Sequence, residues 1–284
     1  GQNRSYYSRA YQEYRAIVMK ERFSYVMTGI AVIIVLVMLW PWIKRRLGIQ
    51  SREMTAAAKE AAWIALTERT DFKGKALRLY HSLKYGLHVI FHPFDGFYEL
   101  KYRQRGSVPA ALVILILVTI TYTLIRQYTG FLFNHNDPAR LNILVELASV
   151  ILPFGLWAGV NWAFTTLMTG KGTFKQIVIA TAYSLIPIVL INLPLIVVSN
   201  YLILEEGAFY YLLTSIAVGW SGALIFIGVM MITHEYTIGK SIFTTILTLV
   251  GMVFTIFLGL VLLNLLELVY RFANEVFTEI AYRV

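Results

Sequence analysis

Three histidines on one face of a predicted helix have the residue type, and two of them the spacing, that a metal site needs. His81, His88 and His92 fall within residues 72–92, and the last two have the i, i+4 separation of helical metal ligands. No glutamate follows His88 as a metalloprotease motif requires, and the nearest acidic residues come only after Pro93. The chain has no cysteine to add a thiolate ligand. We therefore interpret these histidines as interfacial side chains and expect no metal and no cofactor.

A second pattern, at residues 170–173, looks like part of a phosphate-binding loop but lacks its essential residues. Lys171 is followed by Gly172 instead of serine or threonine, and Thr165 stands where the loop needs a glycine. The long apolar stretches of the chain contain no Ser–His pair, no paired aspartates and no His-Glu-x-x-His motif. We expect a tight turn at this position and a non-catalytic protein, with no nucleic acid among its partners.

A third pattern combines Pro187, Asn192 and Pro194 within one apolar stretch. Discontinuous helices line substrate sites in many transporters because their freed carbonyl groups can bind ions. Prolines also kink ordinary spans, in which neighbouring helices re-satisfy the backbone. The three residues therefore predict either a permeation site at a helix break or a simple kink, and the sequence leaves both open.

Six long uncharged stretches must position these residues. A helix rises ~1.5 Å per residue, so about 20 apolar residues cross a hydrocarbon core ~30 Å thick. All 25 Lys and Arg residues fall outside the stretches, and a spanning backbone must satisfy its own hydrogen bonds. The central part of each stretch has no Asp, Glu, Lys, Arg or His, which argues against a proton-coupled carrier. The sequence predicts an all-α, polytopic membrane helix bundle with spans at residues 23–43, 108–125, 147–170, 176–204, 207–233 and 241–266.

The distribution of Lys and Arg predicts which side of the membrane each loop faces. Residues 44–107 carry 13 of them, and basic loops stay on the cytoplasmic side. Lys171, Lys175 and Lys240 then share that side, and both termini lie outside. A cytoplasmic N-terminus, with a first stretch that does not cross fully, is the alternative. The predicted organisation is an extracytoplasmic helical tail (1–22), a first span (23–43), a basic cytoplasmic segment (44–107), a five-span domain (108–266) and an outer amphipathic helix (267–284).

Residues 72–92 are predicted to form an amphipathic helix with a basic polar face. A helix of this kind lies in a membrane interface, although packing beneath the bundle would explain the same pattern. Beyond the last span, Glu267 and Arg271 form a favourable i, i+4 pair on a helix that docks either a partner or lipid. The predicted apolar face of the 72–92 helix consists of Phe72, Ala76, Leu79, Leu83, Leu87 and Ile90.

Several short motifs resemble those of a known family. Residues 92–101, His-Pro-Phe-Asp-Gly-Phe-Tyr-Glu-Leu-Lys, lead through Arg-Gly-Ser at 105–107 into the second apolar stretch. With the turn at 170–175 and Thr-His-Glu-Tyr-Thr at 233–237, the chain resembles the Yip domain family over about residues 79–269. That family is named for eukaryotic members that interact with Rab/Ypt-type GTPases. The resemblance implies five spans after a cytoplasmic segment and no catalytic residues. The added span at 23–43 resembles the bacterial branch, whose members are associated with transport systems, notably solute importers.

Together these features predict an accessory or scaffolding subunit of a membrane transport complex, such as an ABC-type solute importer, in a bacterial cell membrane. A stand-alone channel or carrier and a membrane-shaping protein are the alternatives. The expected partners are the lipid bilayer and other membrane proteins, and the seam Gly155-x-x-x-Gly159 also permits a homo-oligomer. The candidate contact residues lie on the predicted collar helix, the turn and the C-terminal helix, and they are Leu79, Leu83, His88, His92, Phe94, Tyr98, Lys171, Lys175, Arg271 and Glu275.

Overall fold

The computed structural model describes residues 61, 63–65, 71–134 and 142–283, with the backbone alone at residues 277, 280, 281 and 283. Every regular element in these ranges is a helix, which confirms the all-α prediction. The predicted tail at 1–22, the first span at 23–43 and the basic segment up to residue 60 lie outside the described residues.

Five segments of the described chain are long and apolar enough to cross a bilayer, and they match the five later stretches predicted from the sequence. The protein is therefore a polytopic membrane helix bundle. In chain order the spans are α5 (Val108–Tyr128), α6 (Ile143–Leu167), α7 (Phe174–Ser184) with α8 (Ile186–Ser199), η2 (Leu204–Glu206) with α9 (Gly207–Ile225) and the π-helix η3 (Phe226–Thr233), and the first part of α10 (Ile238–Arg283).

The third span is interrupted at Leu185, two residues before Pro187. Pro187 is the second residue of α8, where its missing N–H costs no helical hydrogen bond. The Leu185 N–H bonds instead to the Ala182 carbonyl (3.1 Å), which tightens the chain before the proline. Pro194 lies inside α8 without ending it. α8 is continuous from Pro187 to Pro194, so the interruption lies just before Pro187, whose ring crowds the preceding turn and whose nitrogen has no N–H for the carbonyl four residues earlier.

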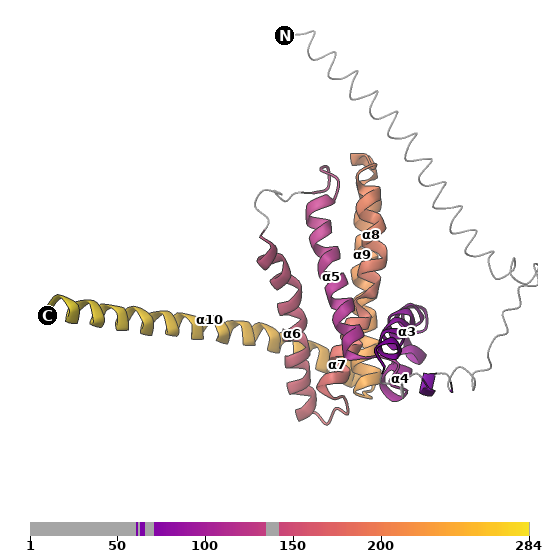
Figure 1. Cartoon of the computed structure of the whole chain (residues 1–284), viewed down its shortest axis with the longest axis horizontal. Helices are drawn as coiled ribbons and strands as arrows, with labels where there is room; N and C mark the ends of the chain where they lie inside the picture. The colour runs from indigo at the N-terminus through magenta and orange to yellow at the C-terminus, as the bar shows by residue number, and fades with distance from the viewer. Residues whose placement is uncertain (1–60, 62, 66–70, 135–141, 284) are drawn as a thin grey trace, which may run out of the picture.

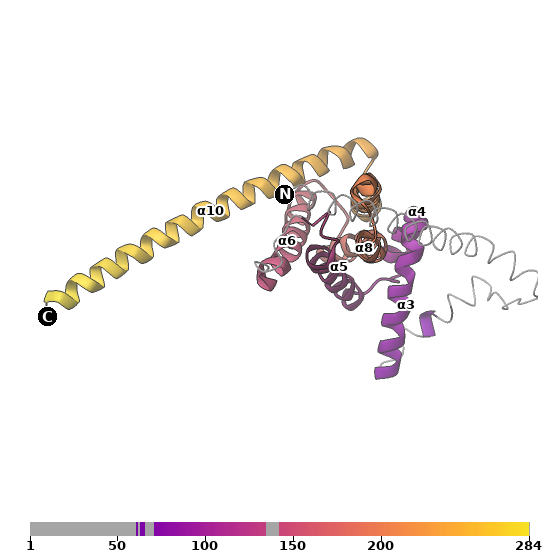
Figure 2. The same ribbon diagram turned by 90° about the horizontal axis from the view of Figure 1, so that it is seen from above.

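Two shorter helices, α3 (Phe72–Phe91) and α4 (Pro93–Tyr102), lie against one end of the bundle, and α3 runs across the direction of the spans (Figures 1 and 2). α3 packs against the core through a stripe that includes Gly86 and Val89, and the Tyr183 hydroxyl of α7 donates to the Ser82 carbonyl (3.0 Å). Packing on the bundle, one of the two possibilities for this helix, is therefore what the structure shows.

The stripe of α3 that is buried differs from the apolar face predicted from the sequence. Phe72 and Leu87 are exposed, whereas Ser82 and Gly86 are buried. Gly86 allows the close approach, since a Cβ there would lie 2.3 Å from the Ile186 side chain. The helix is thus turned so that its small residues meet α7 and α8, and part of its apolar face stays exposed.

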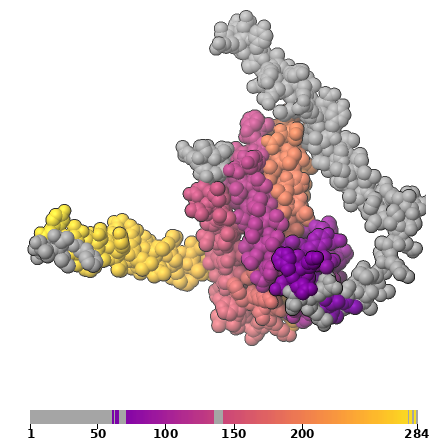
Figure 3. All heavy atoms as spheres, in the orientation of Figure 1, coloured from indigo at the N-terminus to yellow at the C-terminus, as the bar shows by residue number. Residues whose placement is uncertain are grey.

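The last element, α10, is a single helix of 46 residues that leaves the bundle (Figures 1 and 2). Its first turns pack on α6, where Gly251 is buried next to Phe164. From Val253 onward nearly every side chain is exposed on all sides, and the space-filling view shows this part standing clear of the other helices (Figure 3). The predicted last span and outer helix are therefore two parts of one continuous helix.

A tight contact between Gly228 and Phe97 gives a test of the packing between η3 and α4. A Cβ at Gly228 would lie 2.5 Å from the Phe97 ring, so we expect Gly228→Ala to destabilise the protein by about 1–3 kcal/mol. Unfolding by SDS in mixed micelles would measure this loss. Gly219→Ala is the matched control, because a Cβ there meets nothing within 4 Å. Equal stability of the two variants would contradict the contact.

Candidate functional site

Three segments meet at one end of the bundle, which we call the collar end. They are α4, the turn at residues 168–173 between α6 and α7, and the linker at 234–237 between η3 and α10. This end lies at the bottom of the bundle in Figure 1. The Lys171–Glu235 and Tyr236–Met168 contacts join parts of the chain more than 60 residues apart.

Glu235 ties the three segments together. Its carboxylate accepts hydrogen bonds from Lys101 of α4 (2.5 Å) and Lys171 of the turn (2.6 Å), and also from the Tyr102 hydroxyl. The side chain of Lys101 is only 8% exposed, and its ammonium group also contacts the Ile232 carbonyl (3.4 Å). The hydrogen bonds from Lys101, Lys171 and Tyr102 lower the pKa of Glu235 to about 2. Glu235 in turn raises the pKa of Lys171.

Three residues at this end adopt a left-handed backbone conformation that is unusual without glycine. They are Gln104 after α4 (φ 49°), Thr169 in the turn (φ 59°) and Glu235 in the linker (φ 58°), and each such residue costs on the order of 1–3 kcal/mol. Lysine side chains hold the segments around Thr169 and Glu235. Lys240 donates to the Met168 carbonyl (2.8 Å) and to the Thr169 hydroxyl (3.3 Å), as Lys101 and Lys171 do to Glu235. Hydrogen bonds from Lys240 therefore hold the turn at Thr169, and ion pairs with Lys101 and Lys171 hold the linker at Glu235.

A buried histidine lies beneath the turn. His234 is 1% exposed, and its Nε2 is 3.1 Å from the Asn161 Oδ1 of α6. The Asn161 amide donates in turn to the Thr248 hydroxyl of α10 (3.4 Å), so its oxygen is the acceptor and the histidine Nε2 carries the proton. Burial, and secondly the charge of Lys101, lower the pKa of His234 to about 4. The imidazole is therefore neutral at pH 7.

The turn fits over this imidazole because it contains two glycines. A Cβ at Gly170 would lie 2.6 Å from His234 Nδ1, and one at Gly172 would lie 2.8 Å from Cε1. Sequence reasoning missed this histidine because the predicted span at 207–233 ended one residue before it, and only its membership of the 233–237 motif pointed to it. The short connection expected at residues 170–173 extends over residues 168–173, and its glycines lie against His234.

A groove of about 350 Å³ opens beside Glu235. The rings of Tyr98 and Tyr102, whose centroids are 4.6 Å apart, belong to α4, and both side chains are about half exposed. The groove lies between α4 and the η3–α10 linker, and its lining consists of Tyr98, Tyr102, Met231, Ile232, Glu235, Tyr236 and Thr237.

The other residues predicted to make contacts are spread over separate surfaces. Leu79 and Leu83 pack against the core of the same chain. His88 and His92 are exposed and their rings stack 4.8 Å apart. Phe94 and Lys175 are also exposed. The part of the chain that the structure describes contains no group of three or more His, Asp or Glu residues able to hold a metal ion.

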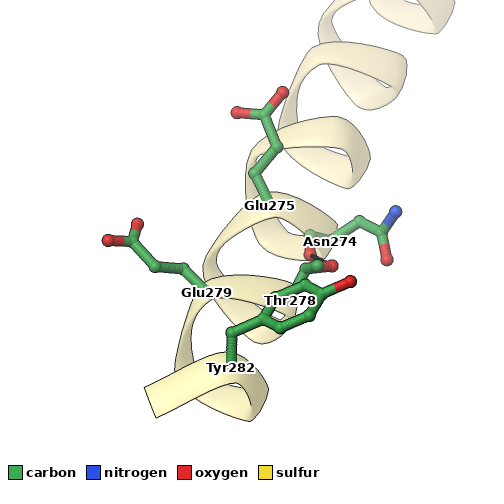
Figure 4. A pocket seen from close by; sticks show the side chains of 5 residues that line it. All are labelled: Asn274, Glu275, Thr278, Glu279 and Tyr282. Atoms are coloured by element: carbon green, nitrogen blue, oxygen red, sulfur yellow. Dashed lines mark hydrogen bonds between the residues drawn. The ribbon is translucent and has the colours of Figure 1, made fainter.

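The predicted permeation residues and the C-terminal contact residues lie far apart along the chain. Pro187 and Asn192 are buried in α8, whereas Pro194 is exposed. On α10, Arg271 pairs with Glu267 (2.5 Å) on the exposed helix surface. Figure 4 shows a shallow hollow at the end of α10 that this helix alone lines, with residues Asn274, Glu275, Thr278, Glu279 and Tyr282.

A family model described as the Yip1 domain matches residues 87–266, well over half of the chain. The chain belongs to the Yip1 domain family. The Yip1 domain begins within α3 and ends within α10, so α4, the turn, the linker, the first four described spans and most of the fifth lie inside it. No curated protein and no solved structure matches the chain. The resemblance to the Yip family is thus confirmed, and membership of the bacterial branch stays a prediction.

The burial of neutral His234 predicts a dependence of stability on pH. The unfolded chain binds a proton near pH 6.5 but the folded Yip1 domain does so only near pH 4, so stability falls as the pH drops through this window. We expect the free energy of unfolding to fall by an amount on the order of 2 kcal/mol between pH 7.5 and 4.5. Thermal unfolding in detergent would measure this change. His234→Gln should remove most of the dependence, and the exposed His88→Gln should keep it. A His234→Gln protein with an unchanged pH profile would contradict the assignment.

Proposed function

We propose that this Yip1-domain protein is a non-catalytic accessory or scaffolding subunit of a membrane transport complex, such as an ABC-type solute importer of a bacterial cell membrane. The collar end would face the cytoplasm, as the basic loops suggest. The observation that carries the proposal is the length and exposure of α10.

The candidate span in α10 is longer than one crossing of a bilayer needs. It covers Ile238–Val276, 39 residues, which at ~1.5 Å per residue gives roughly 58 Å for a hydrocarbon core ~30 Å thick, and its last ten residues include the charged Glu267, Arg271 and Glu275. Beyond Gly251 the rest of the described chain leaves this helix uncovered. Helices of other membrane proteins would cover it through close side-chain packing, the usual basis of association in lipid.

The last turns of α10 add polar groups that could select the partner. Glu267, Arg271 and Glu275 lie exposed on the continuous helix, and alternating charges of this kind set the register of helix pairs. The ion pairs at the collar end would keep the rest of the Yip1 domain rigid while α10 contacts the partner protein.

Purification of the tagged chain from its native membrane in mild detergent, followed by mass spectrometry, tests this proposal. We expect an ATPase and a permease to be recovered in stoichiometric amounts, because a subunit copurifies with its complex. Recovery of the chain alone would contradict the proposal.

A pair of variants tests whether α10 makes the contact. Arg271→Glu removes the intrahelical pair with Glu267, whereas Glu267→Arg combined with Arg271→Glu restores a pair with the charges exchanged. If the partner recognises these charges, both variants should lose about fivefold or more of the copurified protein. Full recovery with the double variant would mean that helix stability alone matters.

A stand-alone channel or carrier is the second candidate, and the buried amide of Asn192 after the interruption at Leu185 favours it. In that case the purified chain in liposomes should move a solute, and Asn192→Leu should reduce the flux. Flux that Asn192→Leu leaves unchanged would argue against this site.

A further inference from the structure

The groove beside Glu235 crosses the level at which the fourth span ends. Met231 and Ile232 belong to the last turn of that span, which runs from Leu204 to Thr233, whereas Glu235 and Thr237 follow it. The groove therefore has an apolar part at the depth of the hydrocarbon and a polar part outside it. A ligand that fills it must have the same two parts in the same order.

The aromatic wall of the groove has the character of a membrane–water boundary. Tyr98 and Tyr102 are adjacent on α4 and each is about half exposed. Tyrosine rings are enriched at this depth because the ring is apolar and the hydroxyl is polar. The groove therefore opens where lipid headgroups meet acyl chains.

The charges around the groove favour an anionic ligand. Glu235 is the charged residue of the lining, and Lys101 and Lys171, which lie beside the groove, share its carboxylate. Lys240 lies 4.3 Å from the ring centroid of Tyr236 and donates to two neutral oxygens. The Lys171 side chain is 69% exposed, and an ammonium group has three N–H donors, so it can bind a second anion. The local excess is two positive charges.

The excess of positive charge extends over all described residues at the collar end and is absent from the described residues at the opposite end. Residues 71–107, 168–175 and 233–241 contain ten Lys or Arg against four Asp or Glu. At the other end the described spans and loops carry Arg126 against Glu146, Glu205 and Glu206. An anionic amphiphile in the leaflet next to the collar end would match this asymmetry.

We propose that the groove lined by Tyr98, Tyr102 and Glu235 binds an anionic phospholipid. Its phosphate lies at Lys171, and one acyl chain lies along Met231 and Ile232. The bound lipid contacts α4, the turn and the linker from outside the bundle. These are the three segments that Glu235 already links. This role is independent of any protein partner on α10.

The test uses the full purified chain in mild detergent, titrated with short-chain phosphatidylglycerol, short-chain phosphatidylcholine or glycerol phosphate. The expected result is a rise in unfolding temperature with phosphatidylglycerol alone, and native mass spectrometry should show one retained lipid per chain. Lys171→Gln, which removes the lysine bonded to the lining residue Glu235, should weaken this binding about fivefold. Lys175→Gln, at a nearby exposed lysine on α7, should leave it unchanged.

Three outcomes would overturn the proposal. An equal effect of phosphatidylcholine would show that the negative charge is not recognised. An equal effect of glycerol phosphate would show that a free phosphate, not a lipid, fills the site. Equal weakening by Lys171→Gln and Lys175→Gln would show a diffuse attraction to the basic surface, which an acidic protein segment could exploit as well. Ile232→Asn tests the apolar part of the groove. This variant leaves Lys171 unchanged and should still weaken lipid binding.

Discussion

The ion cluster around Glu235 is the interaction on which the collar end depends. One carboxylate joins a helix that precedes the five spans, the turn between the second and third, and the linker between the fourth and fifth. Because Lys101 is largely buried, its charge needs a partner at this position, and Glu235 is held in a left-handed conformation to supply it. The backbone strain and the ion pairs are thus parts of one arrangement.

Polar groups inside the bundle are satisfied mostly within the chain. Hydroxyls such as those of Thr121 and Thr248 donate to the carbonyl four residues earlier in their own helices, which removes the cost of an unpaired group in lipid. Asn161 links three segments through His234 and Thr248. At the opposite end, Arg126 of α5 pairs with the buried Glu146 of α6 (3.2 Å). Both ends of the bundle are therefore fixed by charge, while its middle is apolar.

The Yip1 domain places its short motifs at the collar end. The 92–101 segment becomes α4, residues 170–175 supply the glycines of the turn and the start of α7, and residues 233–237 supply both His234 and Glu235. Motifs that are far apart in the chain thus meet in space. Their shared role is to close one end of the bundle, and the groove beside them gives that end a surface with both aromatic and ionic groups.

The sequence by itself determined the number of described spans, their approximate limits and the helix at 72–92, because length, hydropathy and local capping residues such as Ser107 and Thr173 decide these features. Only the tertiary structure decided that His234 is buried, that Glu235 joins three segments and that small residues turn α3 onto the bundle. It also decided that α10 leaves the other helices. These features depend on contacts between residues tens of positions apart, and neither helical periodicity nor charge along the chain carries information about such packing.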